Sequence, residues 1–165
     1  LTMAKIAGAI SEAVDAAEGG IQSMLDDAAM AVMTLNGGSA VPLWNTWLDG
    51  LQEEAPEGEE IDVAGLKAIF AKALEELEDM SGAKVGDKTM MDALIPASEA
   101  VAAYTGDSAD ELFDAAAQAA AQGAEATKQY VSKFGRAKSY GTKTIGTPDA
   151  GAVSMSWFFQ GLARE

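Results

Sequence analysis

The sequence predicts an all-α fold, an antiparallel helical bundle or barrel of about seven helices. Strong helix formers, chiefly alanine, leucine, methionine and glutamate, dominate the composition. Apolar residues recur at the three- and four-residue spacing of amphipathic helices, and no stretch shows the alternating, β-branched pattern of a strand. The 165 residues fit one domain, so we expect a single helical domain over residues 1–165.

Three helices are expected in the first third of the chain. Apolar spacing marks the first over Met3–Val14 and the second over Ile21–Leu35. Pro42 suits the first residue of a third helix, because that position needs no N–H donor. The apolar residues of this third helix continue to Leu51.

A fourth helix follows an acidic loop, Glu53–Glu60, which Pro56 and Gly58 keep irregular. Asp62 is the expected N-cap, because its carboxylate accepts a free N–H of the first helical turn. Apolar residues over Leu66–Met80 then form the clearest amphipathic stripe in the chain, which is typical of a core-facing helix.

Two more helices are expected in the second half of the chain. The fifth covers Lys88–Tyr104, and Pro96 is expected to bend or interrupt it. Ser108 and Glu111 have the spacing of a capping box. That box predicts the start of a long sixth helix, which ends near Phe134.

The end of the sixth helix and the start of the last are marked by single residues. Gly135 is the expected left-handed residue that follows the sixth helix. Asp149 is the expected N-cap of a seventh helix, whose apolar residues continue to Leu162.

The residue inventory excludes several classes of function. The chain has no cysteine and no histidine, which removes disulfides, thiolate metal sites and hydrolases built on a catalytic histidine. The net charge of −15 opposes general nucleic-acid binding. No apolar run reaches membrane-spanning length and no secretion signal opens the chain, so we expect a cytoplasmic protein that does not act at a membrane.

A basic island interrupts the acidic sequence. Residues 1–82 hold sixteen acidic residues and three lysines, whereas residues 128–148 hold four lysines, Arg136 and no acidic residue. The local field of such an island suits an anionic ligand. A solvated basic loop after a helix C-terminus explains the pattern equally well.

Three loops contain glycine and hydroxyl residues of the kind that suit a phosphate site: Asn36–Pro42, Ser81–Met90 and Gly135–Gly151. The first leads directly into a helix, whose free N–H groups favour an anion, although an ordinary turn between helices has the same composition. The third is long for a connection inside a compact domain, and its Arg136 suits a forked contact to a phosphate. None of them is a Walker A loop.

Together, three segments resemble the nucleotide-binding (L) subunit of dihydroxyacetone kinases and the equivalent C-terminal domain of the single-chain, ATP-dependent forms. The segments are Gly37–Leu43, Val85–Leu94 and Gly135–Gly151, and they occur in the family's order. The resemblance runs from Leu1 to the end of the chain. It implies a barrel of antiparallel helices, eight in the family, with a nucleotide at one end.

The resemblance also implies which residues bind ATP or ADP. Ser39 and Ala40 would contact the phosphates through the loop backbone. Gly82 and Met90 would lie beside the adenine, and Arg136 would reach a phosphate. The whole nucleotide set that we expect is Leu1, Thr2, Gly38, Ser39, Ala40, Gly82, Met90, Arg136, Asp149, Ala150 and Gly151.

Departures from the family concern metal and loop chemistry. In the family an aspartate-rich loop that holds two magnesium ions comes just before the position of Leu1. We therefore expect no metal ligand in this chain, which starts after that loop and the helix before it. In addition, Ser39–Val41 stands where the family usually reads Ala-Ser-Gly, and Thr147 and Ala150 stand where the closing loop usually has a histidine and a proline.

The implied function is the nucleotide-binding component of a dihydroxyacetone-type kinase, a phosphotransferase. A separate K subunit or domain holds the ketose, so this chain alone is expected to bind nucleotide without phosphorylating a sugar. Either ATP exchanges as a substrate, or ADP stays bound and a phosphotransferase-system partner rephosphorylates it. Two other functions remain open: a helical scaffold or adaptor without catalysis, and a lipid-binding helical barrel with an apolar cavity.

Overall fold

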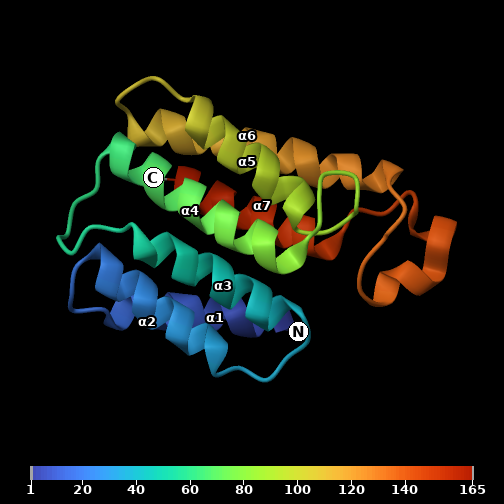
Figure 1. Ribbon diagram of the computed structural model, residues 1–165, viewed down its shortest axis with the longest axis horizontal. Coiled ribbons are helices and arrows are strands. Elements are labelled where there is room, and N and C mark those ends of the chain that lie inside the picture. The colour runs from blue at the N-terminus through green and yellow to red at the C-terminus, as the bar shows by residue number, and fades with distance from the viewer. Residues whose placement is uncertain (1, 165) are drawn as a thin grey trace. The chain divides into compact units, whose positions relative to one another are not determined.

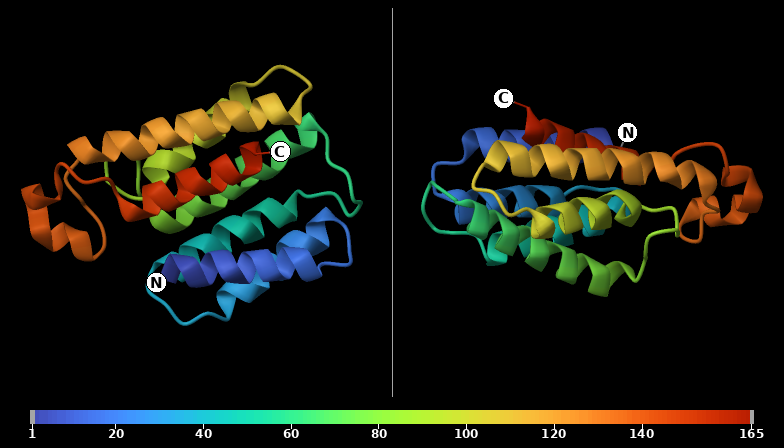
Figure 2. Two further views of the ribbon diagram at one scale, coloured as in Figure 1. Left: turned by 180° about the vertical axis from the view of Figure 1, so that it is seen from behind. Right: turned by 90° about the horizontal axis from the view of Figure 1, so that it is seen from above.

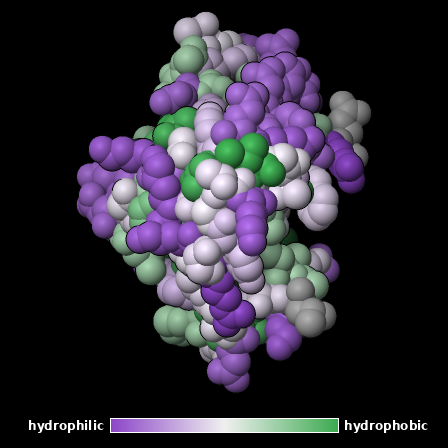
Figure 3. All heavy atoms as spheres, turned by 90° about the vertical axis from the view of Figure 1, so that its right-hand side faces the viewer, coloured by the Kyte–Doolittle hydropathy of each residue, from purple (hydrophilic) through white to green (hydrophobic). Residues whose placement is uncertain are grey.

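The computed structural model describes residues 2–164, which form seven α-helices and two 3₁₀ segments without a strand among them (Figure 1). The all-α prediction is therefore confirmed. The chain separates into two compact units, Leu1–Ser81 (unit 1) and Gly82–Glu165 (unit 2). Hydrophilic residues, purple in Figure 3, cover much of the face that this view shows, in keeping with the net charge of −15.

Unit 1 is built from four helices, and helices adjacent in sequence pack on one another. They are α1 (Thr2–Ala16), α2 (Ile21–Met33), α3 (Ala40–Glu53) and α4 (Val63–Ser81). Consecutive helices run in opposite directions, as Figures 1 and 2 show. The fully buried Trp47 ring lies 5.7 Å from that of Trp44 and 6.1 Å from that of Phe70, centroid to centroid. Burying such aromatic surface is a main source of stability for a unit of this size.

The acidic loop between α3 and α4 closes the start of α2. The backbone N–H groups of Ile21 and Gln22 donate to the carbonyls of Gly58 at 2.8 Å and Pro56 at 3.0 Å. These N–H groups have no acceptor within their own helix, so the loop satisfies them. Gly20 is required at this junction, because a Cβ there would lie 1.8 Å from a backbone oxygen of the loop.

Unit 2 packs α6 against both α5 and α7, and α5 also contacts α7. Its elements are α5 (Met91–Ala103), α6 (Ala109–Ala126), the 3₁₀ segments η1 (Thr127–Gln129) and η2 (Arg136–Thr144), and α7 (Ala150–Ala163). Buried alanines of α6, which include Ala116 and Ala120, let the helix axes approach. No helix among residues 2–164 has the length and hydropathy needed to cross a bilayer.

Two of the predicted helix caps take the expected form. The Asp62 carboxylate accepts the N–H of Gly65 at 2.7 Å, and the Ser108 hydroxyl accepts the N–H of Glu111 at 3.3 Å. The second half of the capping box runs through Tyr104. Its hydroxyl accepts the N–H of Ser108 at 3.1 Å and donates to the Glu111 carboxylate at 2.9 Å.

Two predicted helix boundaries in unit 2 are wrong. Helix α5 begins at Met91 rather than Lys88, because the φ of Lys88 is +62°, which a right-handed helix does not tolerate. Helix α6 ends at Ala126 rather than near Phe134, because the chain leaves it to bond with other loops of the unit. Gly135 consequently does not follow α6 but precedes η2.

Smaller corrections concern the two prolines and the long loop. Helix α3 begins at Ala40, so Pro42 lies inside its first turn rather than at its first position. Helix α5 continues through Pro96 without interruption. The segment Gly135–Gly151, expected to be irregular, contains η2, in which Gly141 has a non-helical backbone.

Candidate functional site

Asp92 shapes the loop that precedes α5. Its side chain is 1% exposed, and its carboxylate accepts the N–H groups of Gly86 at 2.6 Å and Thr89 at 2.7 Å. The Thr89 hydroxyl in turn accepts the N–H of Met91 at 3.1 Å. Because a buried carboxylate is stable only when hydrogen bonds replace its water, Asp92 and the loop backbone stabilise one another.

Asp87 connects this loop to the segment that follows η1. The Lys133 ammonium lies 2.8 Å from the Asp87 carboxylate, and the Lys133 N–H donates to the Asp87 carbonyl at 3.1 Å. The hydrogen bond from Lys133, followed by the bond from the Lys84 backbone, lowers the pKa of Asp87 below its ordinary value of 3.8. Asp87 is therefore ionised at neutral pH and holds the two segments together.

Lys88 makes a second connection between the same segments. Its side chain is 5% exposed, and its ammonium donates to the carbonyls of Thr144 and Thr147, the latter at 2.6 Å. The loop 82–90 and the segment 132–149 thus meet at two points within unit 2.

The segment that leads into α7 is also held from the end of α6. The N–H of Gly146, whose φ is +97°, donates to the Lys128 carbonyl at 2.7 Å. The N–H of Asp149 donates to the buried hydroxyl of Thr127 at 2.8 Å. In contrast, η2 extends away from the helices of its own unit (Figure 1), and Arg136 at its start is exposed.

Asp149 begins α7, as predicted. Its carboxylate accepts the N–H of Ala152 at 2.9 Å. Partial burial raises the pKa of Asp149 above its ordinary value of 3.8, and the nearby Asp92 raises it further, whereas the Ala152 N–H and the Lys88 ammonium lower it. The net effect is an increase, so burial has the largest influence on the pKa of Asp149.

Several predicted nucleotide residues come together in unit 2. A Cβ on Gly151 would lie 3.4 Å from the Cβ and the N of Met90, so the starts of α7 and α5 lie against each other. Asp149 and Ala150 are at the same helix start. Gly82 lies at the far end of the loop 82–90, with a φ of +63° and no atom within 4 Å of a Cβ position.

The other predicted residues lie in unit 1, at the start of α3. Ser39 is the N-cap, and its side chain makes no capping hydrogen bond. A Cβ on Gly37 would lie 2.9 Å from the Thr2 side chain, which places Thr2 beside this loop, whereas Gly38 has no atom within 4 Å of a Cβ position. Ala40 is the first helical residue.

Leu1, the remaining predicted residue, lies outside the described residues. Among residues 2–164, no three Asp or Glu side chains form a group that would hold a metal ion. The described part of the chain therefore does not fit the magnesium ions that the resemblance implies.

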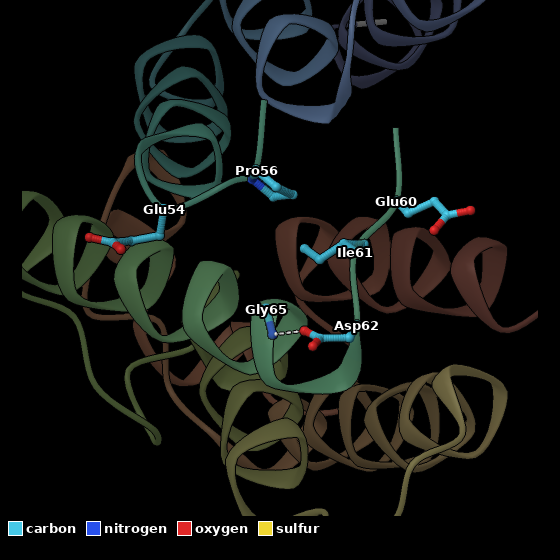
Figure 4. A pocket seen from close by; sticks show the side chains of 6 residues that line it. All are labelled: Glu54, Pro56, Glu60, Ile61, Asp62 and Gly65. Atoms are coloured by element: carbon cyan, nitrogen blue, oxygen red, sulfur yellow. Dashed lines mark hydrogen bonds between the residues drawn. The ribbon is translucent and has the colours of Figure 1, made fainter. Parts of the chain in front are cut away.

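A hollow of about 520 Å³ lies beside the acidic loop of unit 1 (Figure 4). Its lining residues are Glu54, Pro56, Glu60, Ile61, Asp62 and Gly65. The side chains of Glu54 and Glu60 point in opposite directions, away from Ile61. Three acidic side chains around one hollow repel phosphate groups, so this is not the candidate nucleotide site.

Lys88 and Asp92 are absent from the residues that the sequence predicts for the site. Their residue types alone do not indicate a buried role, because a lysine in a loop and an aspartate in a first helical turn are usually exposed. Thr89 and Asp92, three residues apart as in a capping box, are the one pattern that points to a carboxylate holding this loop backbone.

The geometry defines an all-helical fold with glycine-containing loops at helix starts. The chain belongs to the DAK2 domain family, whose model matches residues 1–164. This confirms the resemblance to the nucleotide-binding part of dihydroxyacetone kinases.

Relatives and a solved structure agree with this family. An L-erythrulose kinase of Pectobacterium atrosepticum is 35% identical over an alignment of 153 residues, which covers 88% of this chain and 25% of that protein. The ADP-binding subunit DhaL of PEP-dependent dihydroxyacetone kinase 2 from Listeria innocua is 30% identical, over 88% of this chain and 67% of the subunit. The crystal structure of the dihydroxyacetone kinase of C. freundii matches with a TM-score of 0.63 at 25% identity, over 86% of this chain and 23% of that one.

Proposed function

We propose that this chain is the nucleotide-binding component of a dihydroxyacetone-type kinase. It binds ATP or ADP and presents a phosphoryl group to dihydroxyacetone or another short ketose, which a separate K subunit or domain holds. One observation carries the proposal: in a chain of the DAK2 domain family, the loop 82–90 and the segment 132–151 are bonded to each other at the starts of α5 and α7. The names of the relatives, an ADP-binding subunit and two kinases, support it.

We assign the phosphates to the start of α3, at Gly38, Ser39 and Ala40. A helix N-terminus has free N–H groups and a partial positive charge, and both favour a phosphate. Ser39 is exposed and its hydroxyl is not used as a cap, while Gly38 has no side chain to hinder close approach. Leu1 and Thr2 extend this assignment toward the N-terminus.

The remaining contacts are assigned to unit 2. The open backbone at Gly82 and the backbone of the buried Met90 are assigned to the adenine. Arg136 is exposed, and within residues 2–164 its guanidinium has no hydrogen-bond partner, so its forked donors suit a phosphate. The start of α7, Asp149–Gly151, is assigned to the nucleotide as well.

This assignment gives the chain a binding and orienting role. Phosphoryl transfer depends mainly on positioning and on neutralising charge. The bound nucleotide supplies the phosphoryl group. The N–H groups of α3 and the Arg136 guanidinium neutralise phosphate charge, and the chain needs no nucleophile of its own.

Two donor cycles agree with the names of the relatives. In one, ATP exchanges with each turnover; in the other, ADP stays bound and a phosphotransferase-system partner that uses PEP rephosphorylates it. Gel filtration of the ADP-loaded protein separates them. Co-elution of ADP indicates the second cycle, and its loss indicates the first.

Calorimetric titration with ADP, with and without Mg²⁺, tests the proposal. We expect the unchanged chain to bind ADP and Arg136→Ala to bind it about 10- to 100-fold more weakly, the loss expected for a hydrogen bond to a charged group. Arg164→Ala, an exposed arginine at the end of α7, is the matched control and retains the affinity. Absence of ADP binding by the unchanged chain overturns the proposal, and an unchanged affinity of Arg136→Ala removes that residue from the site.

A further inference from the structure

Lys88 is an unusual residue in this chain. Lysine side chains are almost never fully buried, yet this one is only 5% exposed. It is also the one residue other than glycine, within residues 2–164, that has a positive φ, at +62°. A left-handed backbone is unfavourable for a residue with a side chain and persists where the surroundings enforce it.

The contacts of the Lys88 ammonium explain its burial. It donates to the carbonyls of Thr144 and Thr147, which lie on either side of the turn at Gly146. Within residues 2–164 it makes no ion pair, so its charge is stabilised by these two carbonyl dipoles. Burying an ammonium is costly, and hydrogen bonds of this kind are what offset it.

The turn that Lys88 holds leads directly to the start of α7. Asp149 follows Thr147 closely, and Gly151 packs against Met90, which in turn is close to Lys88 in sequence. Residues 88–90 therefore contact both the turn and the helix start. Removing the ammonium would leave this part of the segment without two of its hydrogen bonds.

We infer that Lys88 is a positioning residue that fixes the segment Thr144–Gly151 against the loop 82–90 before a nucleotide binds. The expected effect of Lys88 on ADP binding rests on the proposed function. The expected effect of Lys88 on the order of the segment does not depend on ADP. Lys88 acts through the backbone it holds and does not touch the ligand.

Hydrogen–deuterium exchange without nucleotide tests the first effect. We expect Lys88→Met to raise the exchange of the amides of residues 144–151 by about tenfold or more, the change expected for lost hydrogen bonds to a charged group. Lys88→Gly accepts the left-handed φ without strain and also lacks the ammonium. An increase in both variants assigns the effect to the side chain. Lys84→Met, an exposed lysine of the same loop, is the matched control and leaves the exchange unchanged.

ADP titration over a range of pH tests the second effect. We expect both Lys88 variants to bind ADP at least about tenfold more weakly. The Lys88 charge lowers the pKa of Asp149, whereas the Asp92 charge raises it. Removing the Lys88 charge therefore raises the pKa of Asp149. We expect the midpoint of the pH dependence of ADP binding to move to a higher pH in Lys88→Met. An unchanged pH dependence would contradict this link between Lys88, Asp149 and the ligand.

The outcomes separate this inference from the proposed function. Unchanged exchange over residues 144–151 in both Lys88 variants overturns the inference, whatever ADP does. If the unchanged chain binds ADP, and the Lys88 variants show increased exchange but an unchanged affinity for ADP, the link between Lys88 and the ligand is overturned. If the unchanged chain binds no ADP, the proposed function fails, while the exchange data still decide the role of Lys88.

Discussion

At the start of α7, Asp149 combines two effects on its protonation. It caps the helix by accepting the Ala152 N–H, which favours the carboxylate, but its partial burial near Asp92 favours the protonated acid. Burial dominates, so the pKa of Asp149 is raised. The folded state then binds a proton more tightly than the unfolded state, and ionising Asp149 reduces the free energy of unfolding as the pH rises.

This sign gives a prediction for Asp149→Asn. Asparagine caps a helix as well as aspartate does, but it carries no charge to be buried. We expect the free energy of unfolding of Asp149→Asn, relative to the unchanged chain, to increase as the pH rises from 3.8 through the raised pKa of Asp149. Urea unfolding followed by circular dichroism at several pH values measures it.

The control variant for Asp149 is Asp149→Ala, which lacks a cap. It should be about 0.5–2 kcal/mol less stable than Asp149→Asn at every pH. A relative stability of Asp149→Asn that falls as the pH rises would contradict the assigned direction of the pKa shift.

Residue-level prediction succeeded where the chemistry is local. Asp62, Ser108 and Asp149 are helix caps, and a cap is set by a side chain and the N–H groups a few residues later. Lys88 was not predicted, because the carbonyls it contacts are distant in sequence. Asp92 was not predicted, because its partners Gly86 and Thr89 belong to a loop with an unusual backbone angle at Lys88. The residues near Lys88 in sequence do not indicate that its ammonium contacts the carbonyls of Thr144 and Thr147.

Among the elements, the contact between α5 and α6 depends on Gly123. Pro96 has no N–H to donate to the carbonyl of Asp92, four residues earlier, and Gly123 packs against that carbonyl. A Cβ on Gly123 would lie 2.0 Å from the Asp92 oxygen. The proline in α5 and the glycine in α6 therefore form one packing feature.

We predict that Gly123→Ala lowers the free energy of unfolding by about 1–3 kcal/mol, because the added methyl group forces the helices apart. Helix propensity alone would favour alanine by up to about 1 kcal/mol. Gly161→Ala in α7 is the matched control, since nothing lies within 4 Å of its Cβ position, and it should not lose stability. Thermal unfolding of both variants measures the difference; a stabilised Gly123→Ala would show that the contact yields easily.

Element boundaries follow the same division between local and distant causes. The amphipathic stripe of α4 placed that helix well, because its apolar spacing and its Asp62 cap agree. The end of α6 was placed too late, because apolar and helix-favouring residues continue beyond Ala126. There the chain turns away, because Thr127 accepts a hydrogen bond from Asp149, and Ser132 and Lys133 donate to other loops of unit 2.

On the scale of the whole molecule, charge is the dominant surface property. The net charge is −15, and the acidic residues are concentrated in residues 1–82. Like charges at this density repel one another and favour expansion. Salt shortens the range of that repulsion, so it should stabilise the folded chain.

We expect the melting temperature to rise by roughly 2–4 °C, or about 1 kcal/mol, when the salt concentration increases from about 0.01 M to about 1 M. Differential scanning calorimetry measures the change. A variant in which Glu57, Glu59 and Glu60 are replaced by glutamine should show a smaller salt effect. A melting temperature that falls with added salt would mean that ion pairs such as those of Lys72 outweigh the repulsion.

The all-α class and the family were predicted from the sequence, and the comparisons confirm both. The class follows from composition and periodicity, which are properties of the whole chain. The nucleotide residues stay a prediction. The described geometry places Thr2 and Gly38–Ala40 at the start of α3, and Met90 and Asp149–Gly151 at the starts of α5 and α7. Gly82 and Arg136 lie outside both groups. The sequence also did not predict the bonds that join the loop 82–90 to the segment before α7.

The bonds from the acidic loop to α2 matter to anyone who modifies this protein. By composition, Glu53–Glu60 is the obvious place to insert an epitope tag or a fluorescent reporter, since it is polar, irregular and rich in proline and glycine. Its carbonyls, however, accept the first N–H groups of α2 and so replace the turn that would precede that helix. An insertion between Pro56 and Gly58 would remove the acceptors of the first N–H groups of α2. A loop that looks tolerant of insertions is therefore part of what holds unit 1 together.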